Sequence, residues 1–243
     1  MIKTLPSVVV PVPSRLIAHL APQNSFDSTY RDFDSSSRIS DKGRSVWNET
    51  PRPFITSPQM IDSLKRNGVR VILDAACGDG RNLIPLAKAG FRVTGLDFSP
   101  EALGRCEVRC DYALFTGERS NVNLVPGRLE DVPRIFSVGE FDAVVWDFQS
   151  VHEADPSRIV DNFAYALRKG GFVLAEFMST KDPHYGNGKQ IMENVFIQGE
   201  KGKEQLIRLY TPKIIASLFE KHFEIKGFVR KLLLGSTTRG WIC

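Results

Sequence analysis

A glycine-containing turn with carboxylates follows an apolar run in the first third of the chain. The stretch VILDAACGDGRNL, residues 71–83, holds two aspartates and two glycines: Asp74, Asp79, Gly78 and Gly80. Glycine has no Cβ, so its backbone can approach a ligand closely. Carboxylates beside such a turn suit a ligand that carries a positive charge, and they oppose a phosphate group. The turn therefore predicts a binding site for a ligand with a cationic group.

Two phosphate-binding motifs fit this turn poorly. A P-loop needs GxxxxGK[ST], which the turn lacks, and YGNGKQ at 185–190 has neither the spacing nor the Ser or Thr. A dinucleotide fingerprint needs GxGxxG, and Leu83 stands where its third glycine belongs. A nicotinamide-dependent oxidoreductase is therefore disfavoured.

The elements that must position this turn alternate regularly from residue 70 onward. Short apolar runs typical of buried strands occur at 70–75, 91–97, 141–147 and 172–177. Segments with helical spacing or helix-start signals separate them, at 81–90, 99–110 and 155–171. Strands that alternate with helices predict an α/β fold with a mostly parallel sheet and helices on both faces.

The remaining segments have a different character. Residues 1–45 are rich in Ser, Asp and Arg and predict a partly mobile arm, whereas 46–243 predict one domain with its core at 70–177. We interpret 178–210, a long segment with Gly and Lys, as an insert. A further helix and an antiparallel hairpin at the sheet edge are expected after it, at 211–221, 223–234 and 238–243.

The composition narrows the class of partner. The chain has 243 residues, 42% of them apolar, and its net charge of +4 is spread along the whole length. Without a basic block, a nucleic-acid partner is not expected. Cys106 and Cys110 lack the further ligands of a zinc site, so we expect reduced thiols and no metal. No stretch approaches the roughly 20 apolar residues of a membrane span, and the cytoplasm is the expected location.

Four segments in order resemble the class I S-adenosylmethionine-dependent methyltransferase family over residues 70–177. They are LDAACGDGRN (73–82), VTGLDFSPEAL (93–103), FDAVVWDFQSVHEADP (141–156) and ALRKGGFVLAEF (166–177). SVWNETPRPFI (45–55) and KDPHYGNGK (181–189) are similar to small-molecule methyltransferases of the tellurite-resistance type. The resemblance implies a Rossmann-like, seven-stranded sheet and S-adenosylmethionine as cofactor.

The resemblance also implies a set of cofactor-binding residues. Asp97, at the end of the second strand, would accept hydrogen bonds from the ribose hydroxyls, in preference to the alternative role of a helix-capping aspartate. Asp74 would orient the turn or receive the amino group of the cofactor, directly or through water, and Phe98 would lie along the adenine face. The remaining predicted contacts are Ala76, Gly78, Gly80, Asn82, Leu129, Glu130, Asp147 and Phe148.

The chain departs from the family pattern after the third strand. Family members commonly have an acidic residue there that meets the adenine amino group. In PGRLEDVP (126–133), Arg128 occupies that place. Glu130 or Asp131 would then substitute for the acid, and Leu129 would supply the backbone contact.

The residues that follow the fourth strand indicate which kind of molecule accepts the methyl group. FQSVHEAD (148–155) lacks the Asn/Asp-Pro-Pro-aromatic turn of relatives that methylate amino groups of nucleic acids and proteins, which favours a small-molecule acceptor. His152 is the candidate general base, because imidazole titrates near neutral pH. Candidate acceptor-lining residues are Tyr30, Trp47, His184 and Tyr185. A cofactor-binding protein without transfer activity, or an RNA or protein acceptor, are the alternatives.

Replacement of the candidate base tests its role. We expect His152→Ala to lower the turnover number far more than the affinity for the cofactor, because a general base acts on the acceptor in the transition state. Steady-state kinetics and calorimetry on the same preparation measure both quantities. A turnover number that hardly changes would remove His152 from the mechanism.

Overall fold

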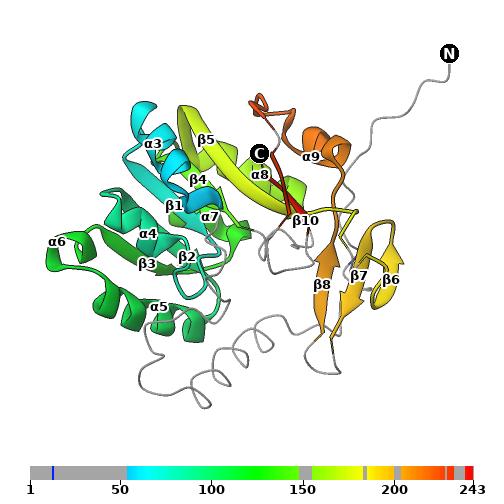
Figure 1. Cartoon of the computed structure of the whole chain (residues 1–243), viewed down its shortest axis with the longest axis horizontal. Helices are drawn as coiled ribbons and strands as arrows, with labels where there is room; N and C mark the ends of the chain where they lie inside the picture. Colours follow the sequence, from blue (N-terminus) through cyan, green and yellow to red (C-terminus); the bar gives the residue numbers. More distant parts are fainter. Residues whose placement is uncertain are drawn as a thin grey trace.

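Seven strands form one sheet in the order β3-β2-β1-β4-β5-β10-β9 (Figure 1). The computed structural model describes Pro13 and residues 54–147, 155–182, 185–199, 204–227, 229–232 and 239–242. The strands are β1 Val71–Ala75, β2 Arg92–Asp97, β3 Val122–Pro126, β4 Phe141–Trp146, β5 Leu167–Met178, β9 Val229–Leu232 and β10 Arg239–Ile242. Strands β1 to β5 pair in parallel, and β10 pairs antiparallel with both β5 and β9.

The predicted α/β, Rossmann-like fold with an antiparallel C-terminal hairpin is confirmed, and the parallel part has five strands. The predicted N-terminal arm at 1–45 lies almost wholly outside the described residues.

The strand order reverses between β1 and β4. Chain crossovers lead from β1 outward to β3 on one side and from β4 outward to β5 on the other. In open α/β sheets the crevice at such a switch point, outside the carboxyl ends of the strands, is where ligands bind. The turn at Asp74 and the end of β4 at Asp147 therefore lie at the edge where a ligand is expected.

Two hydrophobic clusters cover the two faces of the sheet. Neighbouring residues of β1 point in opposite directions, so Leu73 joins one cluster and Ile72 joins the other. The first cluster includes side chains of α7 Val132–Ile135, α8 Pro156–Ala166 and α9 Pro212–Phe219. The second includes side chains of α3 Pro58–Arg66, α4 Leu83–Lys88 and α5 Pro100–Ala113. The helices on both faces are thus as predicted; the short elements η2 Phe54–Thr56, η3 Leu129–Asp131 and α6 Thr116–Arg119 complete the described helices.

Helix starts follow the local sequence closely. Ser99 caps α5 by accepting a hydrogen bond from the Ala102 backbone N–H at 3.1 Å, and Pro100 is the first helical residue, as predicted. The predicted end of α8 at the glycine pair is wrong. The helix ends at Ala166, because Leu167 already pairs with Phe141 of β4 and begins β5.

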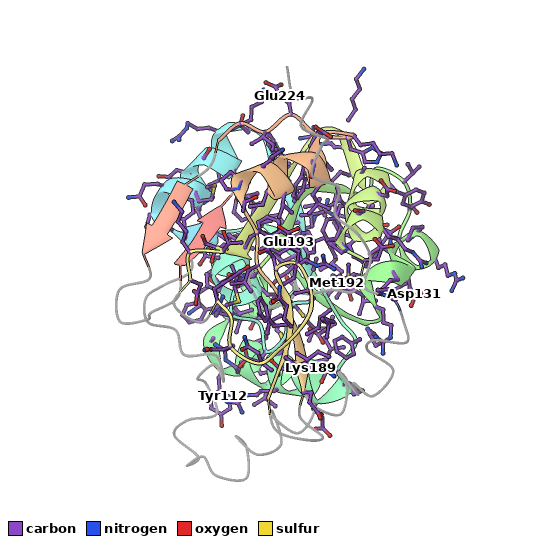
Figure 2. All side chains as sticks on the ribbon, turned by 90° about the vertical axis from the view of Figure 1, so that its right-hand side faces the viewer. Tyr112, Asp131, Lys189, Met192, Glu193 and Glu224 are labelled. Carbon is purple, nitrogen blue, oxygen red and sulfur yellow. The ribbon has the colours of Figure 1, made fainter. Side chains whose placement is uncertain are left out.

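The insert forms a second sheet that the sequence did not predict. Strands β6 Lys189–Met192, β7 Val195–Gln198 and β8 Gln205–Arg208 are antiparallel and lie beyond the carboxyl end of β5 (Figure 1). The Tyr210 backbone N–H donates to the Met178 carbonyl at 2.7 Å and joins this small sheet to β5. Figure 2 looks at this side and shows Lys189, Met192 and Glu193 in front of the main sheet.

A matched pair of glycine substitutions tests the packing of β2 under the turn. A Cβ on Gly95 would lie 2.6 Å from Leu83 Cδ1 and 2.8 Å from Cys77 Sγ, whereas a Cβ on Gly104 of α5 meets no atom within 4 Å. We expect Gly95→Ala to destabilise the protein by about 1–3 kcal/mol through overpacking. We expect Gly104→Ala to stabilise it by about 0.5–1 kcal/mol, because Ala is the better helix former. Urea unfolding measures both, and an equally stable Gly95→Ala variant would contradict the packing described.

Candidate functional site

The backbone of the turn after β1 takes an unusual conformation. Ala76, Gly78 and Gly80 all have left-handed angles, with φ of 60°, 54° and 84°. For the non-glycine Ala76 this conformation costs about 1–2 kcal/mol, and such strain clusters at functional sites. The Cys77 N–H donates to the Leu96 carbonyl at 3.0 Å, which anchors the turn to β2.

Asp97 ties the same turn to the end of β2. Its two carboxylate oxygens accept hydrogen bonds from the Gly78 N–H at 2.8 Å and from the Ser99 N–H at 2.9 Å. Asp97 therefore organises the backbone before α5 without capping the helix itself, because the N-cap is Ser99. Each carboxylate oxygen can accept a further hydrogen bond, so the predicted ribose contact is compatible with this geometry.

Asp79 points away from the ligand edge. Its carboxylate is fully buried against α5, 3.1 Å from Arg109 Nη1 and 3.7 Å from Arg105 Nε. The interpretation of both turn aspartates as partners of a cationic ligand is thus wrong for Asp79. Gly80 also has an internal reason for its small size, because a Cβ there would lie 2.7 Å from Cys106 Sγ. Side chains of α5 thus pack against the turn and pair with Asp79.

A second polar group joins the turn to the end of β4. Asp147 accepts hydrogen bonds from Asn82 Nδ2 at 2.8 Å and from the Arg81 guanidinium, with which it forms an ion pair. Asn82 is 3% exposed, and its Oδ1 is buried with no hydrogen-bond partner. Arg81 was not among the residues predicted from the sequence. Its position beside Asn82 in GRN is the only sequence signal that pointed to it.

Asp74 lies in the same polar group with an unsatisfied oxygen. The residue is 1% exposed, and its Oδ2 has no hydrogen-bond partner. Burial, helped by the nearby carboxylate of Asp147, raises the pKa of Asp74 to about 8, and the Arg81 guanidinium opposes this shift. Asp74 and Asn82 therefore each have a buried oxygen that lacks a hydrogen-bond partner in the protein. An ammonium group supplies the donors and the charge that such a site lacks.

A pocket opens at the ends of β2 and β3. Its lining consists of Ala76, Leu96, Asp97, Phe98, Gly127, Arg128, Leu129 and Glu130. The carbonyl of Leu129 accepts a hydrogen bond from Asn162 Nδ2 at 2.9 Å, which fixes this segment against α8. Five of the residues predicted from the sequence as cofactor contacts therefore meet here: Ala76, Asp97, Phe98, Leu129 and Glu130.

The predicted acceptor residues are only partly covered by the structure. Tyr30, Trp47, Phe148, His152 and His184 lie outside the described residues. Tyr185 is on the insert, where its hydroxyl donates to Asn194 Oδ1 at 2.8 Å and its ring packs against Phe196. It does not line the pocket described above.

The described residues also bear on metal sites, reactive thiols and membrane spans. No His, Cys, Asp or Glu side chains gather there in a group of three that could hold a metal ion. Cys77, Cys106 and Cys110 are buried free thiols, and their pKa values are raised, with burial a contributing cause in each case. No helix within the described ranges is long and apolar enough to cross a bilayer.

The fold and the site together define a Rossmann-like domain with a polar group and a pocket at the carboxyl edge of its parallel sheet. Residues 72–171 match the family model of a methyltransferase domain. The chain is 36% identical over 120 residues to an uncharacterised methyltransferase of Synechocystis, covering 48% of this chain and 51% of that protein. It is 33% identical over 132 residues to a ubiquinone biosynthesis O-methyltransferase of Hydrogenovibrio crunogenus, covering 54% of this chain and 48% of that one. The chain thus spans about half the length of these relatives.

Solved structures show the same fold. A methyltransferase from Methanosarcina mazei, described as S-adenosylmethionine-dependent, has a TM-score of 0.65 at 22% identity, covering 76% of this chain and 95% of that one. The 1,6-didemethyltoxoflavin-N1-methyltransferase of Burkholderia thailandensis has a TM-score of 0.59 at 21% identity, covering 96% and 92%. Residues 72–171 are therefore similar to the methyltransferase domain family, and the chain has the fold of S-adenosylmethionine-dependent methyltransferases.

The buried carboxylic acid gives a testable pH dependence. Because the pKa of Asp74 rises from 3.8 to about 8 on folding, the folded protein holds a proton that the unfolded chain releases. Its contribution to stability is therefore present at low pH and is lost as the pH rises towards 8. Asp74→Asn stays neutral at every pH and lacks this loss. We expect the variant to become more stable relative to the wild type between pH 5.5 and 8.5, as measured by urea unfolding; a pH-independent difference would contradict the shift.

Proposed function

We propose that the protein transfers a methyl group from S-adenosylmethionine to a small-molecule acceptor by direct in-line displacement. The observation that carries the proposal is the pair of buried, unsatisfied oxygens of Asp74 and Asn82 beside the Arg81 guanidinium. The amino-acid end of the cofactor has an ammonium and a carboxylate. Acceptors for the first and a cation for the second therefore stand side by side at the switch point of the sheet.

Each residue then has a definite task in cofactor binding. Asp74 and Asn82 accept hydrogen bonds from the ammonium, and Asp147 orients Arg81 towards the carboxylate. Asp97 accepts from the ribose hydroxyls while it holds the turn. Bound there, the cofactor supplies a methyl group on a positively charged sulfur, which is already electrophilic.

The chain's contribution to the transfer is positioning. A nucleophile held in line with the carbon–sulfur bond gains up to about 7–11 kcal/mol from proximity and orientation. The insert at 178–210, which extends β5 beyond the carboxyl edge, supplies the acceptor-side cap in this proposal. His152 acts as general base where the acceptor is a hydroxyl, whereas thiols and amines need no base.

A small acceptor is supported by the relatives and by the charge pattern. The names of two matched proteins, a ubiquinone biosynthesis O-methyltransferase and a toxoflavin N-methyltransferase, refer to small molecules. The net charge of +4 is scattered along the sequence and forms no basic block for RNA. The narrower tellurite-resistance type and a cytoplasmic location belong to the same proposal.

A labelling experiment tests the function and separates it from mere cofactor binding. The protein is incubated with S-adenosylmethionine labelled in its methyl group and with a small-molecule extract of cells, and the labelled product is identified by mass. A labelled small molecule supports the proposal. Cofactor binding in calorimetry without any labelled product would favour a non-catalytic binding protein, and label on RNA or protein would favour a macromolecular acceptor.

Asp97 gives the sharpest substitution for this proposal. We expect Asp97→Asn to weaken binding of S-adenosylhomocysteine by at least about ten-fold, because an amide cannot offer acceptor oxygens to the ribose and to both backbone N–H groups. Asp111→Asn, an exposed aspartate paired with Arg119 on the neighbouring helix, is the matched control and should leave the affinity unchanged. Calorimetry measures both, with circular dichroism to verify folding. Equal affinities for the two variants would speak against the ribose contact.

A further inference from the structure

Arg128 occupies an unexpected position in the pocket at the ends of β2 and β3. Its guanidinium carbon lies 4.9 Å from the centre of the Phe98 ring, and both side chains line the pocket. Arg128 is exposed, and within the described part of the chain no carboxylate forms an ion pair with it. Its described side-chain contact is therefore a stacked one with an aromatic ring.

The chemistry of arginine excludes the role expected at this place. A guanidinium only donates hydrogen bonds, so Arg128 cannot accept one from the amino group of adenine. It is planar, however, and stacks on aromatic rings and on nucleobases. Its exposed contact with Phe98 changes an equilibrium constant by only about two- to five-fold. Stacking of a base on an aromatic side chain is worth about five- to hundred-fold, so a base can displace the guanidinium from the Phe98 ring.

We propose that Arg128 is an adenine-stacking residue. In the free protein its guanidinium covers the Phe98 ring; in the complex it covers the adenine, with Phe98 on the other side of the base. The inference rests on the proposed function, because it takes S-adenosylmethionine as the ligand, and it names a residue that the binding set above does not contain.

Glu130 completes the recognition of the base. It lines the same pocket, is half-buried, and has no ion pair among the residues that the structure describes. Asp97 is the other carboxylate in the lining; it holds the Gly78 and Ser99 N–H groups, and in the proposed function its remaining acceptor capacity serves the ribose. Glu130 is thus the acceptor for the adenine amino group, and Arg128 supplies the stacking surface.

Binding calorimetry with S-adenosylhomocysteine tests the stacking role. We expect Arg128→Ala to raise the dissociation constant by about five-fold, because a contact with a desolvated base is worth more than the exposed contact with Phe98 that it replaces. Arg128→Lys keeps the charge and loses the plane, so it should resemble Arg128→Ala. Arg134→Ala is the matched control, because Arg134 is nearby, 84% exposed and paired with Asp131 outside the pocket. Its affinity should equal that of the wild type.

The outcomes separate this inference from the function on which it rests. If the wild type binds and Arg128→Ala binds equally well, the stacking role is wrong. Full affinity in Arg128→Lys would overturn it too, because charge alone would then suffice. If the wild type does not bind S-adenosylhomocysteine at all, the proposed function fails first, and the inference fails with it.

A second ligand tests the partner role of Glu130. S-inosylhomocysteine has a carbonyl in place of the adenine amino group. We expect the wild type to prefer the adenosyl compound by about ten-fold or more, because a carboxylate facing a carbonyl is left unpaired. Glu130→Gln can donate to that carbonyl and should reduce or reverse the preference. An unchanged preference in Glu130→Gln would show that Glu130 does not accept a hydrogen bond from the adenine amino group.

Discussion

One carboxylate holds together the two strand ends on which the cofactor site is built. Asp97, at the end of β2, accepts hydrogen bonds from the Gly78 N–H in the turn after β1 and from the Ser99 N–H at the start of α5. The turn contains left-handed residues and does not keep this shape without support. On the opposite side, α5 reaches the turn through the Asp79–Arg109 ion pair. In the free protein the turn is thus fixed both by the Asp97 hydrogen bond and by the Asp79–Arg109 ion pair.

This arrangement decides which polar groups remain for the ligand. Asp79 pairs with arginines of α5 and Asp97 accepts from two backbone N–H groups with capacity for further hydrogen bonds, whereas Asp74 and Asn82 each retain a buried oxygen with no hydrogen-bond partner. Burial holds the pKa of Asp74 at about 8, so the free protein keeps it protonated at neutral pH. A ligand ammonium would restore the charged form of the carboxylate. In the proposed function, binding of the ammonium group is therefore coupled to loss of the Asp74 proton.

The two parts of the domain have different physical tasks. The parallel sheet, packed on both faces, gives the cofactor turn a rigid support, and its order brings the ends of β1 and β4 together. The small sheet is joined to the end of β5 through Met178 and Tyr210 and packs as a separate apolar cluster. Transfer of a methyl group depends mainly on where the acceptor is held. If the insert is the acceptor-side cap, as proposed, differences in acceptor can arise there without any change to the turn after β1.

The sequence by itself determined the features that depend on neighbouring residues. Hydrophobic periodicity predicted the parallel strands, Ser99 with Pro100 predicted the start of α5, and the glycine turn predicted the ligand edge. Only the tertiary structure decided the direction of each side chain, because the partners are far apart in the sequence. Asp79 meets Arg109, Arg81 meets Asp147 across 66 positions, and the insert pairs with itself as a separate sheet. No local pattern records such contacts, since they exist only once the strands and helices have packed.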